Sequence, residues 1–294
     1  MLNQKPVEKV IFIDVETTSQ KASFVDLSDE EKFLFMERFK KDIEMDIDEI
    51  HKKHKSKEKK FLEKMENMYD LKAPLFPEFG KIICVSVGIM WETTDNWHIK
   101  TTSFSSDNEI ELLNNLVSHE KLSKIWSNVP GKWEKDISGF YSLCAHNGFV
   151  FDYPYIAKRL IINGILPPPM FDFAHLKPWE ISFLIDTKKE WGFGVFDGAV
   201  SLKLLCHVFN VPTPKDDIDG SDVKRVFWKE NDLPRIVKYC EKDVVALAQV
   251  YLKMKCIKKP IKIYEEPKIE APKTELAKEE TTKAEPEDSS KNNE

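Results

Sequence analysis

Tyr239 and Asp243 are the first residues in this sequence whose types and spacing could do chemistry. They lie four residues apart in a segment that reads as a helix, so the phenol and the carboxylate share one helix face. The pair alone is weak evidence of a site, but the chain offers three further candidate carboxylates: Asp14, Glu16 and Asp152. Carboxylates that converge in one pocket raise one another's pKa unless cations neutralise them. Such hard oxygen ligands favour Mg²⁺ or Mn²⁺ over zinc.

The element that must position Tyr239 and Asp243 is a helix over residues 232–255. Asp232 is a candidate N-cap, and Pro234 suits the first helical turn.

A buried strand is predicted where the apolar, β-branched run Val10 to Ile13 leads into Asp14-Val-Glu16-Thr-Thr. Side chains alternate along a strand, so Asp14 and Glu16 share one face near its end. The alternative is that they are only the solvated end of a strand. Burying two like charges without a partner is costly, which favours a site.

A second strand, 140–147, runs through a short loop into a helix that begins near Asp152. With Pro154 behind it, Asp152 could be an ordinary N-cap. The ends of strands that lead into helices are also where α/β folds place functional side chains, and both interpretations stay open here.

Three segments now stand in order: Asp14-x-Glu16, Asn147-x-x-x-Phe151-Asp152 and Tyr239-x-x-x-Asp243. Together they resemble the DEDD superfamily of 3′→5′ exonucleases, in its tyrosine-bearing subclass. The similarity is to the bacterial stand-alone relatives of the proofreading domain of family B DNA polymerases. It covers about residues 1–18 and 80–255, while the segment 19–79 and the C-terminal tail depart from it.

The resemblance implies an α/β fold of the RNase H-like type, a mixed five-stranded sheet with helices on both faces. It implies two divalent cations, Mg²⁺ or Mn²⁺, held by Asp14, Glu16, Asp152 and Asp243. By the same resemblance, Tyr239 orients the attacking water, since a phenol with a pKa near 10 suits this role better than that of a free base. The predicted substrate contacts are Thr17 and Asn147 at the terminal nucleotide and Lys215 at a phosphate.

The remaining pattern predicts strands at 81–91 and 96–104, which form an antiparallel meander with the first strand. A helix is expected over 110–122, a short strand over 181–186 and a helix over 201–209. Asp186 is assigned a structural role. The division expected is an exonuclease domain over 1–256, interrupted by a charged helical insertion at 19–79, and a disordered charged tail over 257–294.

The insertion carries a capping box at Ser28-Asp-Glu-Glu31 and apolar residues at helical spacing. It is expected to form a helical hairpin or a long broken helix.

Composition narrows the class of protein. The chain has 294 residues, a net charge of −6 and five cysteines, with no Cys-x-x-Cys. The charge argues against a protein that coats nucleic acid, and suits an enzyme that handles a phosphate chain briefly. An odd number of scattered cysteines indicates reduced thiols in a cytoplasmic compartment, and no apolar run is long enough to span a membrane.

The leading hypothesis is therefore an exonuclease that releases nucleoside 5′-monophosphates from single-stranded DNA 3′ ends, in DNA repair or replication. RNA remains an alternative substrate, because both polymers present the same phosphate and 3′ end. A catalytically silent nucleic-acid-binding scaffold is the alternative from another class. The length leaves no room for a polymerase, so a polymerase or repair partner is expected to bind through 19–79.

Overall fold

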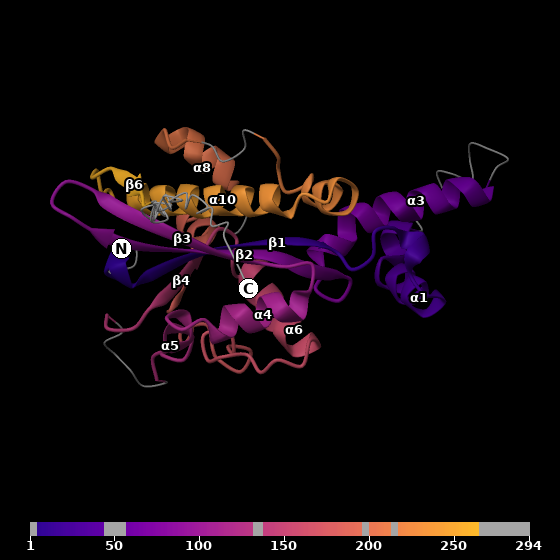
Figure 1. Ribbon diagram of the computed structural model, residues 1–294, viewed down its shortest axis with the longest axis horizontal. Coiled ribbons are helices and arrows are strands. Elements are labelled where there is room, and N and C mark those ends of the chain that lie inside the picture. The colour runs from indigo at the N-terminus through magenta and orange to yellow at the C-terminus, as the bar shows by residue number, and fades with distance from the viewer. Residues whose placement is uncertain (1–4, 44–56, 132–137, 196–199, 213–216, 265–294) are drawn as a thin grey trace, which may run out of the picture. The chain divides into compact units, whose positions relative to one another are not determined.

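Figure 1 shows the protein as a computed structural model that describes residues 5–43, 57–131, 138–195, 200–212 and 217–264. The strands are β1 (Val10–Ser19), β2 (Gly80–Glu92), β3 (Trp97–Ser105), β4 (Ser142–Ala145), β5 (Leu184–Asp186) and β6 (Ile261–Ile263). Within the described ranges they form one mixed sheet in the order β5-β4-β1-β2-β3-β6.

The helices of this part of the chain vary widely in length. The α-helices are α1 (Asp29–Arg38), α3 (Lys57–Lys72), α4 (Glu109–Ser118), α5 (Leu122–Trp126), α6 (Asp152–Ile162), α7 (Thr187–Trp191), α8 (Leu202–Phe209), α9 (Val223–Arg225) and α10 (Leu233–Met254). Three short 3₁₀ turns, η1 (Val7–Lys9), η2 (Phe24–Asp26) and η3 (Ala73–Leu75), and one π-helical turn, η4 (Val226–Glu230), complete the set.

The sheet contains the predicted antiparallel meander. β1 pairs with β2 and β2 pairs with β3, both antiparallel. β4 lies parallel to the other edge of β1, β5 lies parallel to β4, and β6 lies parallel to β3. Because β1, β4 and β5 run the same way, their carboxyl ends meet at one edge of the sheet, where open α/β sheets commonly bind ligands.

The two faces of β1 belong to different cores. Ile11, Ile13 and Val15 pack in the cluster that contains residues of α4, α5 and α6, whereas Val10 and Phe12 pack with residues of α10. Figure 1 shows α10 and α8 on one side of the sheet and α4, α5 and α6 on the other. The even-numbered side chains of β1, which include its acidic pair, therefore share the face that α10 covers.

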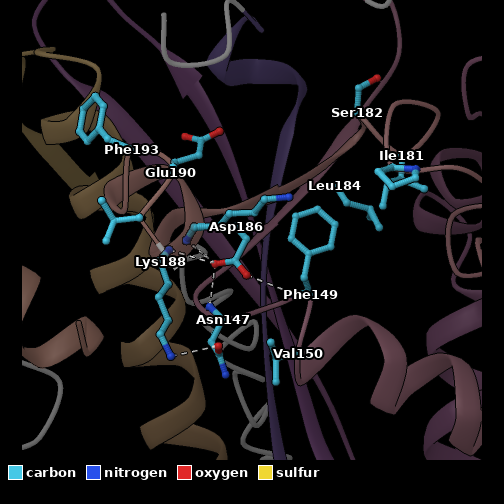
Figure 2. Close-up of a pocket in the computed structure, with 14 residues that line it drawn as sticks. Asn147, Phe149, Val150, Ile181, Ser182, Leu184, Asp186, Lys188, Glu190 and Phe193 are labelled. Atoms are coloured by element: carbon cyan, nitrogen blue, oxygen red, sulfur yellow. Dashed lines mark hydrogen bonds between the residues drawn. The ribbon is translucent and has the colours of Figure 1, made fainter. Parts of the chain in front are cut away.

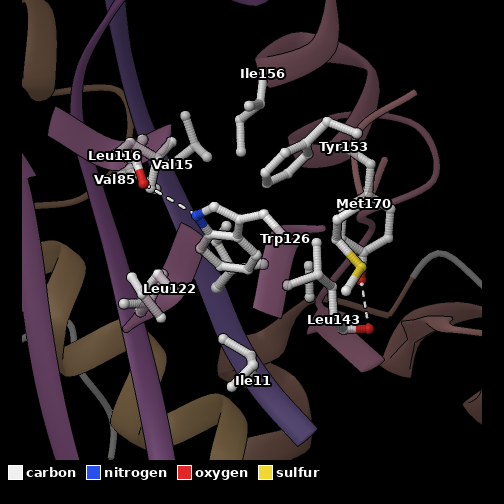
Figure 3. Packing of buried hydrophobic residues seen from close by; sticks show 14 of the residues in the cluster. Ile11, Val15, Val85, Leu116, Leu122, Trp126, Leu143, Tyr153, Ile156 and Met170 are labelled. Atoms are coloured by element: carbon white, nitrogen blue, oxygen red, sulfur yellow. Dashed lines mark hydrogen bonds between the residues drawn. The ribbon is translucent and has the colours of Figure 1, made fainter. Parts of the chain in front are cut away.

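Trp126 is the largest buried side chain of the core beneath α4 and α5. Its indole Nε1 donates to the Leu116 carbonyl at 3.0 Å, and its ring lies 5.5 Å from that of Phe171. Figure 3 shows it among Ile11, Leu143 and other apolar side chains. A hydrogen-bonded indole suits a buried position, because its polar group stays satisfied.

Arg159 on α6 forms a buried ion pair with Glu109. Its Nε donates to Glu109 Oε1 at 2.8 Å, and its Nη1 donates to the Pro77 carbonyl at 2.7 Å. Glu109 Oε1 also accepts from the Ile82 backbone N–H at 2.7 Å. The pair joins α4, α6 and the start of β2, and it fixes the helix that carries Asp152.

The segment 19–79 contains α1 and α3, which build a small core of their own. The capping box predicted at Ser28 and Glu31 is present at the start of α1. The rings of Phe35, Phe39 and Tyr69 pack edge-on or tilted in this cluster. The choice between a hairpin and a broken helix depends on residues 44–56, which lie outside the described residues. A partner for this segment remains a prediction.

The α/β class and mixed sheet are confirmed, but the sheet has six strands within the described residues where five were predicted. The sixth strand, β6, falls inside the range predicted as a disordered tail. The short run Ile261–Ile263 pairs with the outer edge of β3. Without this pairing, the backbone N–H and C=O groups of that edge would lack a partner strand. The tail prediction for 265–294 lies outside the described residues.

The predicted helix 110–122 ends earlier, at Ser118, and α5 follows as a separate helix. Asn108 caps α4 by accepting from the Ile110 and Glu111 N–H groups. No helix in the described ranges has the length and apolar character needed to span a bilayer.

Candidate active site

β1 places Asp14 and Glu16 on the face covered by α10, two residues apart as the alternation predicted. Glu16 is buried and Asp14 is half-buried. The pairing of β1 with β2 shifts register between Glu16 and Thr17. Such an irregularity re-aims the side chains next to it, and bulges are common beside active sites.

α10 carries the second half of the cluster. Asp232 caps this helix by accepting from the Arg235 N–H, and a proline occupies its first turn, as predicted. Tyr239 and Asp243, one turn apart, are both buried and share a side-chain hydrogen bond. Cys240 is buried beside them, and its thiol contacts Asp14.

Asp152 is the first residue of α6, not its N-cap. Phe151 occupies the cap position and makes no side-chain capping bond, so the interpretation of Asp152 as an ordinary cap is wrong. The Asp152 carboxyl is instead buried near the backbone N–H of Val15 in β1. This places a buried carboxyl beside the strand that carries Asp14.

Burial and repulsion between acids raise the pKa values of the cluster. Burial, followed by repulsion from Asp243 and Asp152, raises the pKa of Asp14 well above its ordinary value. Burial, followed by repulsion from Asp14 and Asp243, does the same to the pKa of Glu16. Burial raises the pKa of Asp152 to about 7, despite its backbone hydrogen bonds.

The carboxylates of this cluster fit a divalent cation. One ligand atom each from Asp14, Glu16 and Cys240 lie within 4.8 Å of one another. Buried carboxylates that raise one another's pKa are stabilised in their ionised form by a cation, and oxygen ligands suit hard ions. An acidic cluster able to hold a metal ion is therefore present, with Asp152 and Asp243 at its border.

The three residues predicted to contact the substrate, Thr17, Asn147 and Lys215, lie in different environments. Thr17 is buried, and its hydroxyl donates to the Pro74 carbonyl at 2.8 Å. Asn147 adopts a left-handed backbone conformation (φ 70°) and lines a cavity. Lys215 lies outside the described residues.

Asp186 has the structural role assigned to it. Its carboxylate accepts the backbone N–H groups of Asn147, Phe149, Lys188 and Lys189 at 2.9 to 3.3 Å. Figure 2 shows this carboxylate between Asn147 and Lys188, and the Lys188 Nζ donates to Asn147 Oδ1 at 3.2 Å. Asp186 therefore fixes the loop that precedes Asp152.

Cys240 and Lys188 are the neighbours of the site that sequence reasoning missed. The signal for Cys240 was its position three residues before Asp243, which places it on the same side of the helix. Lys188 gave no signal, because its contact with Asn147 is made between segments 41 residues apart.

The mixed sheet, the helices on both its faces and the acidic cluster between β1 and α10 define an α/β domain of the RNase H-like exonuclease type. Residues 77–288 match a family described as a predicted 3′-5′ exonuclease related to the exonuclease domain of PolB. The match covers more than half of the chain, so the protein belongs to this family. No curated protein sequence matches this chain. The family match begins after β1 and does not include Asp14 or Glu16. Their place in the acidic cluster is therefore known from the fold.

Proposed function

We propose that this protein is a metal-dependent 3′→5′ exonuclease of the tyrosine-bearing DEDD subclass. Its reaction is hydrolysis of the terminal phosphodiester bond of single-stranded DNA, with release of a nucleoside 5′-monophosphate. The observation that supports this most directly is the gathering of buried carboxyl groups from β1 (Asp14 and Glu16) and the start of α6 (Asp152), where burial and then repulsion between acids raise the pKa of each. Strongly perturbed carboxyl groups gathered in one place are typical of functional sites.

The residues that would hold the metal are Asp14, Glu16, Asp152 and Asp243, and the ions proposed are two Mg²⁺ or Mn²⁺. When bound, such ions neutralise the carboxylates, acidify a water molecule and stabilise charge on the phosphate.

Tyr239 supplies a hydroxyl at this cluster. Burial, and then the nearby charges of Glu16 and Asp243, raise the pKa of the phenol above its ordinary value. The hydroxyl therefore keeps its proton at neutral pH, and it serves as a hydrogen-bonding group that orients the attacking water. It does not act as a free base.

The terminal nucleotide is proposed to contact Asn147 and Thr17. Lys188 and Asp186 hold the amide side chain and the backbone of Asn147, respectively, so this residue is preorganised for binding. The Thr17 hydroxyl already donates to Pro74, which leaves its oxygen to accept a hydrogen bond. Lys215 is proposed as a phosphate contact.

The test is a gel assay on 5′-labelled single-stranded DNA and RNA of one sequence, with Mg²⁺, Mn²⁺ or EDTA. We expect a ladder that shortens from the 3′ end only when metal is present, with DNA preferred. The pair Asp14→Asn and Glu16→Gln should lower the rate at least about a hundredfold, because metal ligands are lost. Glu8→Gln, at an exposed acid just before β1, is the matched control and should keep the wild-type rate.

Three results would contradict the proposal. Cleavage by the double variant at the wild-type rate would remove the metal assignment. Retained binding of DNA without cleavage in either metal would favour the silent scaffold, and faster shortening of RNA would make the protein an exoribonuclease.

A further inference from the structure

A cavity of about 660 Å³ opens beside Asn147, where β4 and β5 end. Its volume is within the range of roughly 300–1,000 Å³ that is typical of small-molecule sites. Figure 2 shows that Phe149, Leu184 and Ile181 form one wall, while Lys188 and Phe193 stand opposite. The cavity thus combines an apolar wall, an aromatic ring and basic side chains.

We propose that this cavity binds a further nucleotide of the single-stranded DNA substrate, outside the acidic cluster. The base lies on the apolar wall and against the Phe193 ring, and the phosphate lies near Lys188 and Lys189. The inference rests on the proposed function, because it assigns a second subsite to the same substrate.

Phe193 is the most informative residue of the cavity. Its side chain is 81% exposed, and its backbone adopts φ 46°, a left-handed conformation that bulky residues rarely take. Packing within the described residues explains neither the exposure of the ring nor the left-handed backbone conformation. An exposed ring at the mouth of a cavity is a platform on which a base of any sequence can stack.

The charges of the cavity favour an anion. Lys189 is exposed, and its Nζ lies 4.6 Å from the centre of the Phe149 ring. Backbone N–H groups occupy the carboxylate of Asp186, and burial raises the pKa of Glu190, so both acids of the cavity repel a phosphate less than free carboxylates would. Lysine side chains beside an aromatic platform are the combination that binds single strands without sequence preference.

The binding path continues past the loop that precedes Asp152. Val150, which is exposed, lines both this cavity and a second one of about 220 Å³. The second cavity contains Arg38 from the insertion and Lys158 from α6. A strand that occupied both cavities would therefore cross the loop between Asn147 and Asp152, next to the acidic cluster.

The test measures the affinity of the full chain for a 5′-fluorescein single-stranded DNA by anisotropy, in EDTA, with a gel to show that the DNA stays intact. Phe193→Ala and Lys189→Ala should each raise the Kd about tenfold, which corresponds to about 1.4 kcal/mol. Lys189→Ala should also reduce the slope of log Kd against log salt by about 0.7, the value for one phosphate contact on a single strand. Phe193→Tyr should keep the wild-type Kd because the ring remains.

Lys124→Ala is the matched control, since Lys124 is exposed on α5 and lines neither cavity. Its Kd should equal that of the wild type, and melting curves should show that all variants are folded. Unchanged Kd values for both Phe193→Ala and Lys189→Ala, or no measurable binding by the wild type, would overturn the proposal. The proposed exonuclease activity and the proposed subsite can be contradicted independently of each other. If the wild type does not hydrolyse DNA but its affinity depends on Phe193 and Lys189, the subsite stands without the exonuclease.

Discussion

The thiol of Cys240 is directed at the carboxylate of Asp14. Its Sγ lies 3.3 Å from Asp14 Oδ2 and 3.5 Å from the Asp14 carbonyl oxygen. Burial raises the pKa of this thiol well above its ordinary value, so the thiol keeps its proton and donates a hydrogen bond to the carboxylate. α10 therefore contributes to the cluster through Asp243 and also orients the acid on β1.

Replacing Cys240 with Ala should weaken the binding of metal. Loss of a hydrogen-bonded neighbour of a metal ligand typically lowers affinity 10–100-fold, so the Mg²⁺ concentration for half-maximal activity should rise by about tenfold. Cys240→Ser should restore it, because a hydroxyl also donates. Cys144→Ala, at another buried cysteine in β4, is the control and should leave this concentration unchanged. An equal shift in both alanine variants would trace the effect to packing.

Replacing Tyr239 with Phe should lower kcat by about 10–100-fold with little change in KM, because the hydroxyl acts on the reacting water and not on the strand. The loss should be equal at pH 7 and pH 9, since the pKa of the phenol is raised and the hydroxyl stays protonated across this range. Tyr251→Phe is the control on the same helix. Its buried hydroxyl has no hydrogen-bond partner among the described residues, so the rate should not change. A Tyr239→Phe enzyme with wild-type kcat would exclude the orienting role.

The parts of the site that follow from local periodicity could be predicted from the sequence. The two-residue spacing of Asp14 and Glu16 and the four-residue spacing of Tyr239 and Asp243 fix their shared faces once the strand and helix are assigned. The caps at Asp232 and Ser28 are equally local, because side chain and backbone partner lie three residues apart.

Features that depend on contacts between distant segments could not be predicted. β6 pairs with β3 across more than 150 residues, and its short run in a charged, Pro-rich stretch gave a stronger signal for disorder. The role of Asp152 was ambiguous because a helix start suits both a cap and a ligand. The structure distinguishes the two, because Phe151 occupies the cap position and the Asp152 carboxyl lies near the backbone of Val15 on β1.

Replacing Arg159 with Met should destabilise the fold by about 3–5 kcal/mol, because it leaves the Glu109 carboxylate buried without its cation. Urea denaturation would measure this loss. Lys158→Met removes the neighbouring ion pair on the same helix, where Lys158 and Glu78 lie 3.6 Å apart and are both exposed. That variant should lose less than about 1 kcal/mol. Equal losses in the two variants would show that the buried pair has no special contribution.

The stability of the metal-free protein should depend on pH through the acidic cluster. In the unfolded chain an Asp carboxyl ionises near pH 4, whereas in the fold burial raises the pKa of Asp152 to about 7. Between these values the folded state binds more protons than the unfolded state. The free energy of unfolding therefore falls as the pH rises from about 4 to about 7, and it is lowest above that range.

Thermal melts in EDTA at pH 5 and pH 8, repeated with Mn²⁺, would measure this dependence. The melting temperature of the metal-free protein should drop more between pH 5 and pH 8 in the wild type than in Asp152→Asn, whose amide does not ionise. Mn²⁺ should restore stability at pH 8 in the wild type, since a cation that binds only the folded state stabilises it. Asp95→Asn, in the exposed turn between β2 and β3, is the control and should keep the wild-type dependence. An Asp152→Asn variant with the same drop as the wild type would mean that this carboxyl does not titrate within the cluster.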